Sequence, residues 1–417
     1  MGAARCIRNV GIPSDSGTLN SSKRGVKTMS ENDIEARVTA ELAAAGEAML
    51  ALLEKLVNTD SPSRDKAGVD RVGAIIRSFL EAEGIPVEAV ANHGFGDVLK
   101  ASVMPAAGSN APPVLLMGHR DTVFPLGEAE RRPFRRDGAR AYGPGVGDMK
   151  AGLVVNAFVL RALKRHGGAD RPVVGLFTAD EEIGSPSSRP VIEREAAAAA
   201  AVFNSEPGRA NGNVVTGRKG GMFLELVVEG RAAHSGAPPG TGASAIEAVA
   251  RKVIALHALA DAGSGISLNV GVLNGGEVVN MVAPRARAEF DLRYVKLADR
   301  APMLEKIDAI VAAEDVKGAR ASLGVMSEFL PFEQSADSKA LFDCYVGAAA
   351  DVGLQLGGDF SGGCADSGFA AATGTPTLCG TGPIGAGYHT PDEYIELATV
   401  VPRAQALALA VLRAGRL

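Results

Sequence analysis

Long apolar runs are missing from this 417-residue chain. No stretch of about 18 uninterrupted apolar residues occurs, so we expect no membrane-spanning helix. Residues 1–29 contain Arg and Lys but no apolar segment of signal-peptide length, which argues against a secretory signal. This polar, Gly- and Ser-rich segment is predicted to be a disordered tail. Met29 is a candidate translation start, because helical periodicity begins immediately after it.

Closely spaced cysteines and clustered positive charge are also missing. The four cysteines, Cys6, Cys344, Cys364 and Cys379, lie far apart and form no C-x-x-C motif. This argues against a disulfide framework and against a thiolate metal site, and a reducing cytoplasm is the simpler location. The net charge of −5, without a Lys/Arg stripe, argues against a nucleic-acid-binding surface.

The composition that is present, with 46% hydrophobic and 22% charged residues, is typical of a soluble globular enzyme long enough for two domains. Residues 30–212 and 325–417 alternate strands, loops and helices, which predicts an α/β domain with a mainly parallel sheet flanked by helices. Residues 213–324 follow the order strand–helix–strand–strand–helix–strand, typical of a ferredoxin-like α+β domain. The second domain is therefore predicted to be inserted into the first, and we find no internal repeat.

The stretch Val173–Ser185 is the point around which we expect the molecule to be organised. An apolar strand over residues 173–178 runs into three consecutive acids that include Glu181 and Glu182. Ligands of α/β proteins bind at the carboxyl ends of strands. Adjacent side chains there can diverge, so one glutamate would hold a cation while the other moves a proton. The alternative is a solvated acidic turn.

Metal-ligand side chains also follow other apolar segments, and a sheet would bring these segment ends together. Histidine and carboxylate make a mixed N/O ligand set, which suits Zn²⁺ and tolerates Mn²⁺ or Co²⁺. The candidate metal ligands are His119, Asp148, Glu182, Glu206 and His389.

Five ligands exceed the three that a single catalytic zinc normally uses, but they suffice for two ions sharing one carboxylate. We therefore predict two divalent metal ions, most simply Zn²⁺, with Glu181 accepting a proton from the attacking water. Asp121 would hydrogen-bond the second imidazole nitrogen of His119 and fix its tautomer. Taken singly, each residue has an ordinary alternative, such as a loop histidine at position 389 or a turn at position 206.

Five motifs in combination resemble a known family. They are Gly118-His119-Arg120-Asp121-Thr122-Val123, Gly147-Asp148-Met149-Lys150-Ala151-Gly152, Asp180-Glu181-Glu182-Ile183-Gly184-Ser185, Ser205-Glu206-Pro207 and Gly387-Tyr388-His389. From about residue 45 onward the chain resembles the dinuclear-zinc metallopeptidase family of aminoacylase, succinyl-diaminopimelate desuccinylase, acetylornithine deacetylase and glutamate carboxypeptidase. It looks closest to the bacterial glutamate carboxypeptidase branch.

This resemblance implies that Asp148 bridges the two metals and that the peptide bond after it is cis. It also implies that Glu181 is the general base and later the acid to the leaving group. The other ligands would pair as His119 with Glu206 and Glu182 with His389.

The resemblance also implies roles for residues of the inserted domain. His234 would cross a homodimer interface formed by this domain and stabilise the oxyanion in the partner's site. Asn280 and Arg293 would contact substrate, with Arg293 binding a carboxylate, and Gly363 with its neighbour Gly362 would line the site mouth. The alternatives are a turn amide at Asn280 and a surface ion pair at Arg293.

The sequence is best interpreted as a cytoplasmic two-metal hydrolase that cleaves an amide-type C–N bond of a small carboxylate-bearing molecule. Carboxypeptidase or N-acyl amino-acid hydrolase action is the expected activity, without nucleic-acid or membrane partners.

One departure from the family leaves two other functions open. Glutamate-releasing relatives carry an arginine before a Pro-x-Phe, whereas the comparable stretch Ser327–Phe332 has an acid and an aromatic residue. A pocket bearing Phe329 and Phe332 would accept an aryl ring, as in a hydrolytic deaminase of an aromatic amine such as nitroanthranilate. The third possibility is a catalytically inactive metal-dependent binding protein, against which the retention of Glu181 argues.

Overall fold

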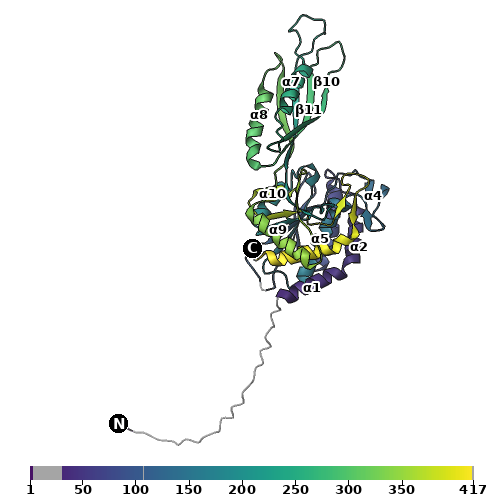
Figure 1. Cartoon of the computed structure of the whole chain (residues 1–417), viewed down its shortest axis with the longest axis vertical. Helices are drawn as coiled ribbons and strands as arrows, with labels where there is room; N and C mark the ends of the chain where they lie inside the picture. The colour runs from purple at the N-terminus through teal and green to yellow at the C-terminus, as the bar shows by residue number, and fades with distance from the viewer. Residues whose placement is uncertain (3–30, 107, 416–417) are drawn as a thin grey trace.

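The computed structural model describes residues 1–2, 31–106 and 108–415. The predictions of a tail over residues 1–29 and of a start at Met29 concern mainly residues 3–30, which lie outside the described residues. Figure 1 shows a broad part, in which helices surround a large sheet, and a narrower part that projects from it.

An eight-stranded sheet forms the centre of the broad part. Its strand order is β1-β2-β6-β3-β7-β14-β8-β13. The strands are β1 (Val87–Val90), β2 (Val98–Val103), β3 (Val114–His119), β6 (Val173–Thr178), β7 (Ala201–Asn204), β8 (Val214–Arg218), β13 (Gly358–Ser361) and β14 (Thr377–Cys379). The run from β6 through β3 and β7 to β14 is parallel, as is the pair β8 and β13. The remaining pairs are antiparallel, so the prediction of a mainly parallel sheet flanked by helices is confirmed.

The helices of the broad part bury apolar sides against this sheet and against one another. They are α1 (Glu31–Ala44), α2 (Gly46–Val57), α3 (Lys66–Ala82), α4 (Glu128–Arg131), α5 (Ala151–Arg165), α6 (Arg189–Ala197), α9 (Ala336–Asp351), α10 (Ser367–Ala372) and α11 (Val400–Ala414). The residues of α5 from Ala151 to Leu163 are all buried, because helices and the sheet both contact it. Residues 31–57 form two helices that meet at Ala45 and Gly46, where glycine disfavours helix continuation.

The C-terminal helix has the length and apolar composition of a membrane span over Leu397–Ala414. In the structure, however, α11 packs against α1, α5 and α9. Ten of its residues are buried, from Val400 to Ala414. Because α11 contacts other helices on several sides, it is a core helix of the broad part.

The projecting part is a four-stranded antiparallel sheet with two helices on one face (Figure 1). Its strands lie in the order β10 (Ser267–Gly275), β11 (Arg285–Tyr294), β9 (Gly220–Glu229) and β12 (Arg320–Phe329). Helices α7 (Ala245–His257) and α8 (Arg300–Ala312) pack on these strands. Along β9, alternate residues from Met222 to Val228 are buried beneath the helices, as expected for a sheet covered on one face.

The strands of the large sheet continue past residue 213, where the inserted segment is predicted to begin. β8 pairs with β13 and β14 in the large sheet, and the small sheet extends from Gly220 to Phe329. The apolar run in β8 consists of its first two residues, Val214 and Val215. A run of two residues is too short to predict a strand.

A third, small sheet joins distant parts of the chain beside the large one. It consists of β15 (Gly385–Ala386), β16 (Tyr394–Glu396), β5 (Arg140–Tyr142) and β4 (Arg135–Asp137). Arginine side chains lie on its tyrosines, with Arg140 3.8 Å from the Tyr394 ring centroid and Arg135 4.0 Å from that of Tyr142. The pairing of β16 with β5 connects the loop that contains His389 to the segment that leads to Asp148.

Candidate metal centre

Parallel pairing brings three predicted site segments to one edge of the large sheet. His119 is the last residue of β3, and β3 pairs in parallel with both β6 and β7. Glu181 follows β6 and Glu206 follows β7, each after a short step. The acidic residues therefore lie on either side of the histidine, as expected for strand carboxyl ends.

The first candidate metal cluster consists of His119, Asp148 and Glu206. The Nε2 atom of His119 lies 3.1 Å from Asp148 Oδ1 and 3.7 Å from Glu206 Oε1. The three ligand atoms lie within 4.8 Å of one another. One cation could therefore contact all three.

The second cluster consists of Asp148, Glu182 and His389. The Nε2 atom of His389 lies 3.4 Å from Asp148 Oδ2 and 3.2 Å from Glu182 Oε2. Asp148 belongs to both clusters and presents a different carboxylate oxygen to each histidine. The structure thus brings all five predicted ligands together, in two groups that share one carboxylate. The Asp148-Met149 peptide bond is cis.

The residues of the two clusters fit divalent cations. Glu206 Oε1 is buried and has no hydrogen-bond partner among the described residues, a costly arrangement that a cation would relieve. Burial and the neighbouring Asp148 raise the pKa of Glu206 and bring that of Glu182 to about 7. Hydrogen bonds to Asp148 and Glu182 raise the pKa of His389 to about 10. Protons and metal ions would compete for these ligand atoms.

Glu181 lies beside the clusters but belongs to neither of them. Its carboxylate is 3.9 Å from His119 Nε2 and is largely buried. Burial, with Glu206, Asp366 and Glu182 nearby, raises the pKa of Glu181 well above its usual value. A carboxylate in this position has no ligand role to fill and is available for proton transfer.

Asp121 contacts both His119 and the acidic loop after β6. The Nδ1 atom of His119 lies 3.0 Å from the backbone carbonyl oxygen of Asp121 and 3.4 Å from its carboxylate. The carboxylate accepts hydrogen bonds from the backbone N–H groups of Glu181 and Glu182, both at 3.1 Å, and from Ser63 Oγ at 2.6 Å. Asp121 therefore holds the acidic loop as well as the histidine.

Glu393 is a supporting residue that the sequence did not reveal. Its buried carboxylate accepts the backbone N–H groups of Gly145 at 2.9 Å, Gly147 at 2.8 Å and Asp148 at 2.9 Å. These three hydrogen bonds fix the backbone that carries the shared aspartate. The only available signal was that Glu393 follows His389 by four residues in a loop.

Asp366 is a second supporting residue that was missed. It accepts hydrogen bonds from Ser185 Oγ and, at 3.2 Å, from Thr178 Oγ1. These contacts tie the loop that contains Gly363 to the end of β6. Gly363 itself is exposed, and its carbonyl accepts a hydrogen bond from Arg218 Nη1 at 3.2 Å.

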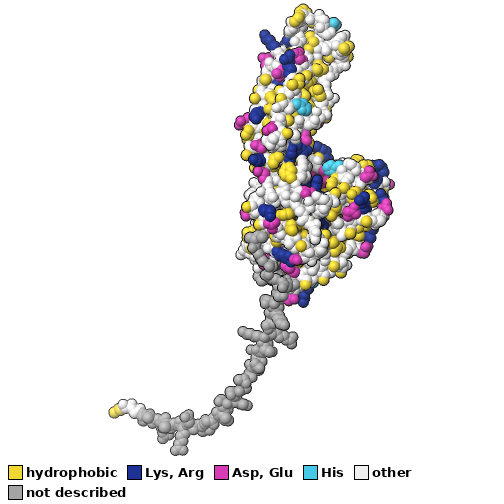
Figure 2. Space-filling model, in the orientation of Figure 1, with side chains coloured by type: hydrophobic (Ala, Val, Ile, Leu, Met, Phe, Trp, Pro, Cys, Tyr) yellow, Lys and Arg dark blue, Asp and Glu magenta, His cyan; other side chains and the backbone are white. Residues whose placement is uncertain are grey.

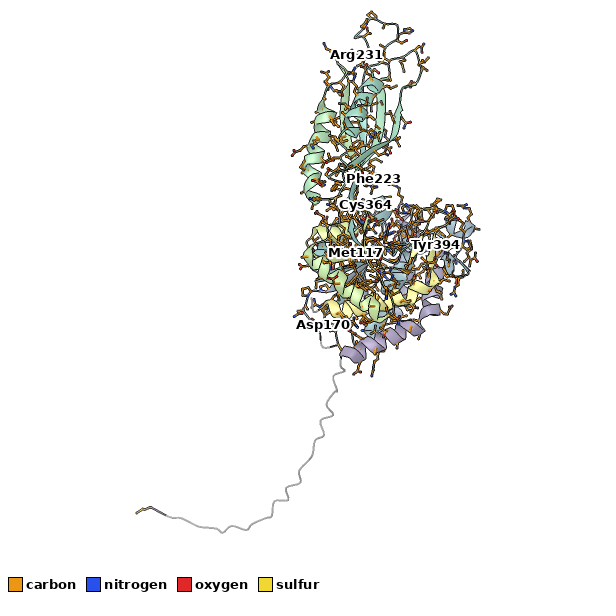
Figure 3. All side chains as sticks on the ribbon, viewed as in Figure 1. Met117, Asp170, Phe223, Arg231, Cys364 and Tyr394 are labelled. Carbon is orange, nitrogen blue, oxygen red and sulfur yellow. The ribbon has the colours of Figure 1, made fainter. Side chains whose placement is uncertain are left out.

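Arg293 lies at the near end of the small sheet, where the two parts meet. Its guanidinium donates to Asp291 at 2.8 Å and to Cys364 Sγ at 2.8 Å, and lies 5.2 Å from the Phe223 ring centroid. Figure 3 shows Phe223 and Cys364 close together at this junction. Figure 2 shows basic and histidine side chains gathered in the same region. Arg293 is thus placed near the site, with part of its donor capacity already used.

His234 and Asn280 do not join the metal clusters of their own chain. They are exposed in adjoining loops, where Asn280 O accepts the backbone N–H of Ser235 at 2.9 Å. These loops lie beyond the distal end of β9, a ten-residue strand about 30 Å long. Arg231, labelled in Figure 3, marks that end of the small sheet.

The expected aromatic pocket is not formed by Phe329 and Phe332. Phe329 packs against Phe369, with ring centroids 5.8 Å apart, and Phe332 is buried beside Val215 and Cys379. Both phenylalanines are core residues, because the end of β12 turns into the large domain rather than along its surface.

Comparisons with known proteins agree with this geometry. The model of "Peptidase family M20/M25/M40" matches residues 115–413, more than half of the chain. Carboxypeptidase G2 of a Pseudomonas species is 29% identical over 374 residues, covering 88% of this chain and 89% of the relative. An acetylornithine deacetylase of Erwinia tasmaniensis is 26% identical over 334 residues, covering 75% and 83%.

Solved structures share the fold. Aminopeptidase PepT of Bacillus cereus superposes with a TM-score of 0.71 at 21% identity, covering 89% of this chain and 99% of that one. An M20 family metallo-carboxypeptidase of Sulfolobus solfataricus gives a TM-score of 0.72 at 18% identity, covering 88% and 99%. The chain therefore belongs to peptidase family M20/M25/M40 and is a metal-dependent hydrolase of peptide or amide C–N bonds.

Proposed function

We propose that this enzyme uses two metal ions to release an amino acid from small carboxylate-bearing amides, as a carboxypeptidase or an N-acyl amino-acid hydrolase. The observation that supports this most strongly is the position of Asp148, shared by two N/O clusters, with Glu181 beside them. The relatives named carboxypeptidase and acetylornithine deacetylase support the same substrate class.

The two clusters would each hold one metal ion, and Asp148, which belongs to both clusters, would serve as a ligand in each. Mixed histidine and carboxylate ligands favour Zn²⁺ and also accept Mn²⁺ or Co²⁺. When bound, such ions polarise the scissile carbonyl and lower the pKa of the attacking water. The remaining ligands divide as His119 with Glu206 and Glu182 with His389.

The protein's own groups would move the protons and fix the geometry. Glu181 takes a proton from the attacking water and returns it to the leaving nitrogen. Asp121 holds the backbone of both Glu181 and Glu182, so the two neighbouring carboxylates keep separate directions. Arg293 binds a substrate carboxylate through the part of its guanidinium that Asp291 and Cys364 leave available.

We also propose a homodimer in which His234 and Asn280 complete the site of the partner subunit. The strand β10 is an edge of the small sheet, and an exposed edge can pair with a second chain. Leu273 on this strand is 51% exposed, and Ile254 on the neighbouring helix α7 is 73% exposed. An apolar surface of this kind, beside the loops of His234, supports association. A cytoplasmic location remains a prediction.

The two other functions are not favoured. The aromatic-amine deaminase depended on Phe329 and Phe332 as pocket residues, and both are buried in the core. The inactive binding protein is disfavoured because the named relatives are hydrolases and because Glu181 keeps a position suited to proton transfer.

The test is metal analysis combined with a substrate panel. We expect about two ions per chain after reconstitution with Zn²⁺, and amino-acid release from dipeptides or N-acyl amino acids. Ammonia release from nitroanthranilate without hydrolysis of any amide would contradict the proposal, as would full activity with a single ion per chain.

A further inference from the structure

A groove lies between the metal centre and the open face of the small sheet. Its volume is ≈ 420 Å³, within the range of small-molecule sites. One side is formed by Arg64, Glu182 and Ile183 of the broad part, and the other by residues of β9, β10, β11 and β12. Because Glu182 is a candidate metal ligand, a molecule in this groove would reach the metal centre.

Arg64 is a cation that lines the groove together with Glu182, on a backbone segment that is held on both sides. Its neighbour Ser63 donates to Asp121 at 2.6 Å, and its other neighbour, Asp65, caps α3 by accepting the Gly68 N–H at 3.1 Å. The backbone on both sides of Arg64 is therefore held in place. The side chain is exposed and has no acid within ion-pair distance in the described part of the chain.

The other charges that line the groove already have partners. Asp291 accepts from Arg293 at 2.8 Å, and Glu289 pairs with Arg287 at 2.5 Å. Glu182 faces His389 at the metal centre. Within the described lining, Arg64 is thus left as the charge available to a ligand.

The wall opposite Arg64 offers apolar contact. Phe223, Val272 and Met326 line it, and Met326 is 53% exposed. An aliphatic chain would lie against these side chains, whereas an anionic group would pair with the guanidinium. The groove therefore matches a short hydrocarbon arm that ends in a carboxylate.

We propose that Arg64 binds a second carboxylate of the substrate, so that dianionic amides are preferred over monoanionic ones. One carboxylate pairs with Arg293, and the other reaches Arg64 along the apolar wall. This inference rests on the proposed hydrolase function and assigns its substrate class. The second carboxylate belongs either to the acyl group or to the side chain of the released amino acid, and the test separates these two sources.

The experiment compares kcat/KM within matched substrate pairs. N-glutaryl-leucine and N-pentanoyl-leucine differ by a carboxylate on the acyl side, and N-acetyl-glutamate and N-acetyl-norvaline by one on the amino-acid side. We expect the native enzyme to favour the dianionic member of one pair by about tenfold or more. Arg64→Gln is expected to reduce that ratio to about one, and Arg64→Lys to retain part of it because the charge remains.

Arg37→Gln is the matched control, since it removes the same charge from an exposed position on α1, at the far side of the broad part (Figure 1). It should keep the native ratio. Equal rates within both pairs for the native enzyme, or an unchanged ratio in Arg64→Gln, would overturn the inference while leaving the hydrolase function intact. If the native enzyme hydrolysed none of the four amides, the proposed function itself would be overturned.

Discussion

Polar side chains are held in opposite ways at the two ends of this molecule. At the carboxyl edge of the large sheet, His119 and Asp121 are fully buried, and Asp148 has its backbone fixed by Glu393. In the loops beyond the small sheet, His234 and Asn280 are exposed, and their hydrogen bonds are local, such as that from the Gly236 N–H to His234 Nδ1 at 3.0 Å. The first group comes together within one chain, whereas the second would act on the partner's site in the proposed dimer.

The largest expected effect is at the end that is complete in one chain. Glu181→Gln should lower kcat by about 10³-fold or more, because the attacking water loses its proton acceptor. Metal content should remain native, since Glu181 belongs to neither cluster. Kinetics and elemental analysis test both points, with the exposed Glu81→Gln on α3 as control. Loss of a metal ion in Glu181→Gln would make this residue a ligand rather than a base.

The exposed end should give the next largest effect if it acts in the partner's site. His234→Ala is expected to lower turnover by about 10²-fold, the usual loss of an oxyanion donor. Mixing His234→Ala with Glu181→Gln subunits should restore roughly a quarter of native activity, because random pairing gives half heterodimers with one intact site each. A mixture no more active than its components would place the action of His234 within its own chain.

Weakening the support of the shared aspartate, Asp148, should cause a smaller loss of activity. Glu393→Gln exchanges one acceptor oxygen for an NH₂ group that faces backbone N–H donors. Metal affinity is then expected to fall about 10–100-fold, as for other groups that orient metal ligands. Chelator competition measures this change, and excess metal should recover much of kcat. Glu396→Gln, which alters a partly exposed pair with Arg140, is the control, and equal affinities for the two variants would contradict the role of Glu393.

The sequence was sufficient to predict the five residues that the structure brings together in two clusters, but not the groups that hold them in place. His119 and Glu206 were predictable because they follow apolar strands, and strand ends converge in a parallel sheet. Glu393 and Asp366 lie in irregular loops with no period, so only tertiary contacts reveal them. Phe329 and Phe332 were misplaced for a related reason, since local hydrophobicity does not distinguish a pocket wall from a core.

The prediction of the fold from the sequence was limited in the same way by short elements. Helices and long strands of the two parts follow the 3.6- and two-residue periods that identify them. β8 and the strands of the third sheet are short, and β4 consists only of the charged residues Arg135–Asp137. Their pairing depends on segments far away in the chain, such as β16 with β5, which no local pattern encodes.

The two edges of the small sheet offer a narrower comparison. Leu273 on β10 and Val325 on β12 are 51% and 60% exposed. Helix α7 packs against β10, and Ile246 of α7 lies so close to Gly275 that a Cβ atom added there would be 3.2 Å from Ile246 Cγ1. Leu273→Asp should therefore dissociate the dimer, because a charge blocks edge pairing, whereas Val325→Asp should not. Sedimentation velocity distinguishes these outcomes. Dissociation by Val325→Asp alone would move the interface to β12.

The smallest expected effects separate a groove residue from a core residue. Phe223 lines the groove, so Phe223→Leu should raise KM several-fold through lost contact with substrate while the melting temperature stays near the native value. Phe329 packs on Phe369, and Phe329→Leu should instead cost about 1 kcal/mol of stability and lower the melting temperature by about 2 °C, with KM unchanged. If Phe329→Leu altered KM more than Phe223→Leu, Phe329 would line the substrate pocket as the sequence predicted. An aryl substrate would then be favoured again.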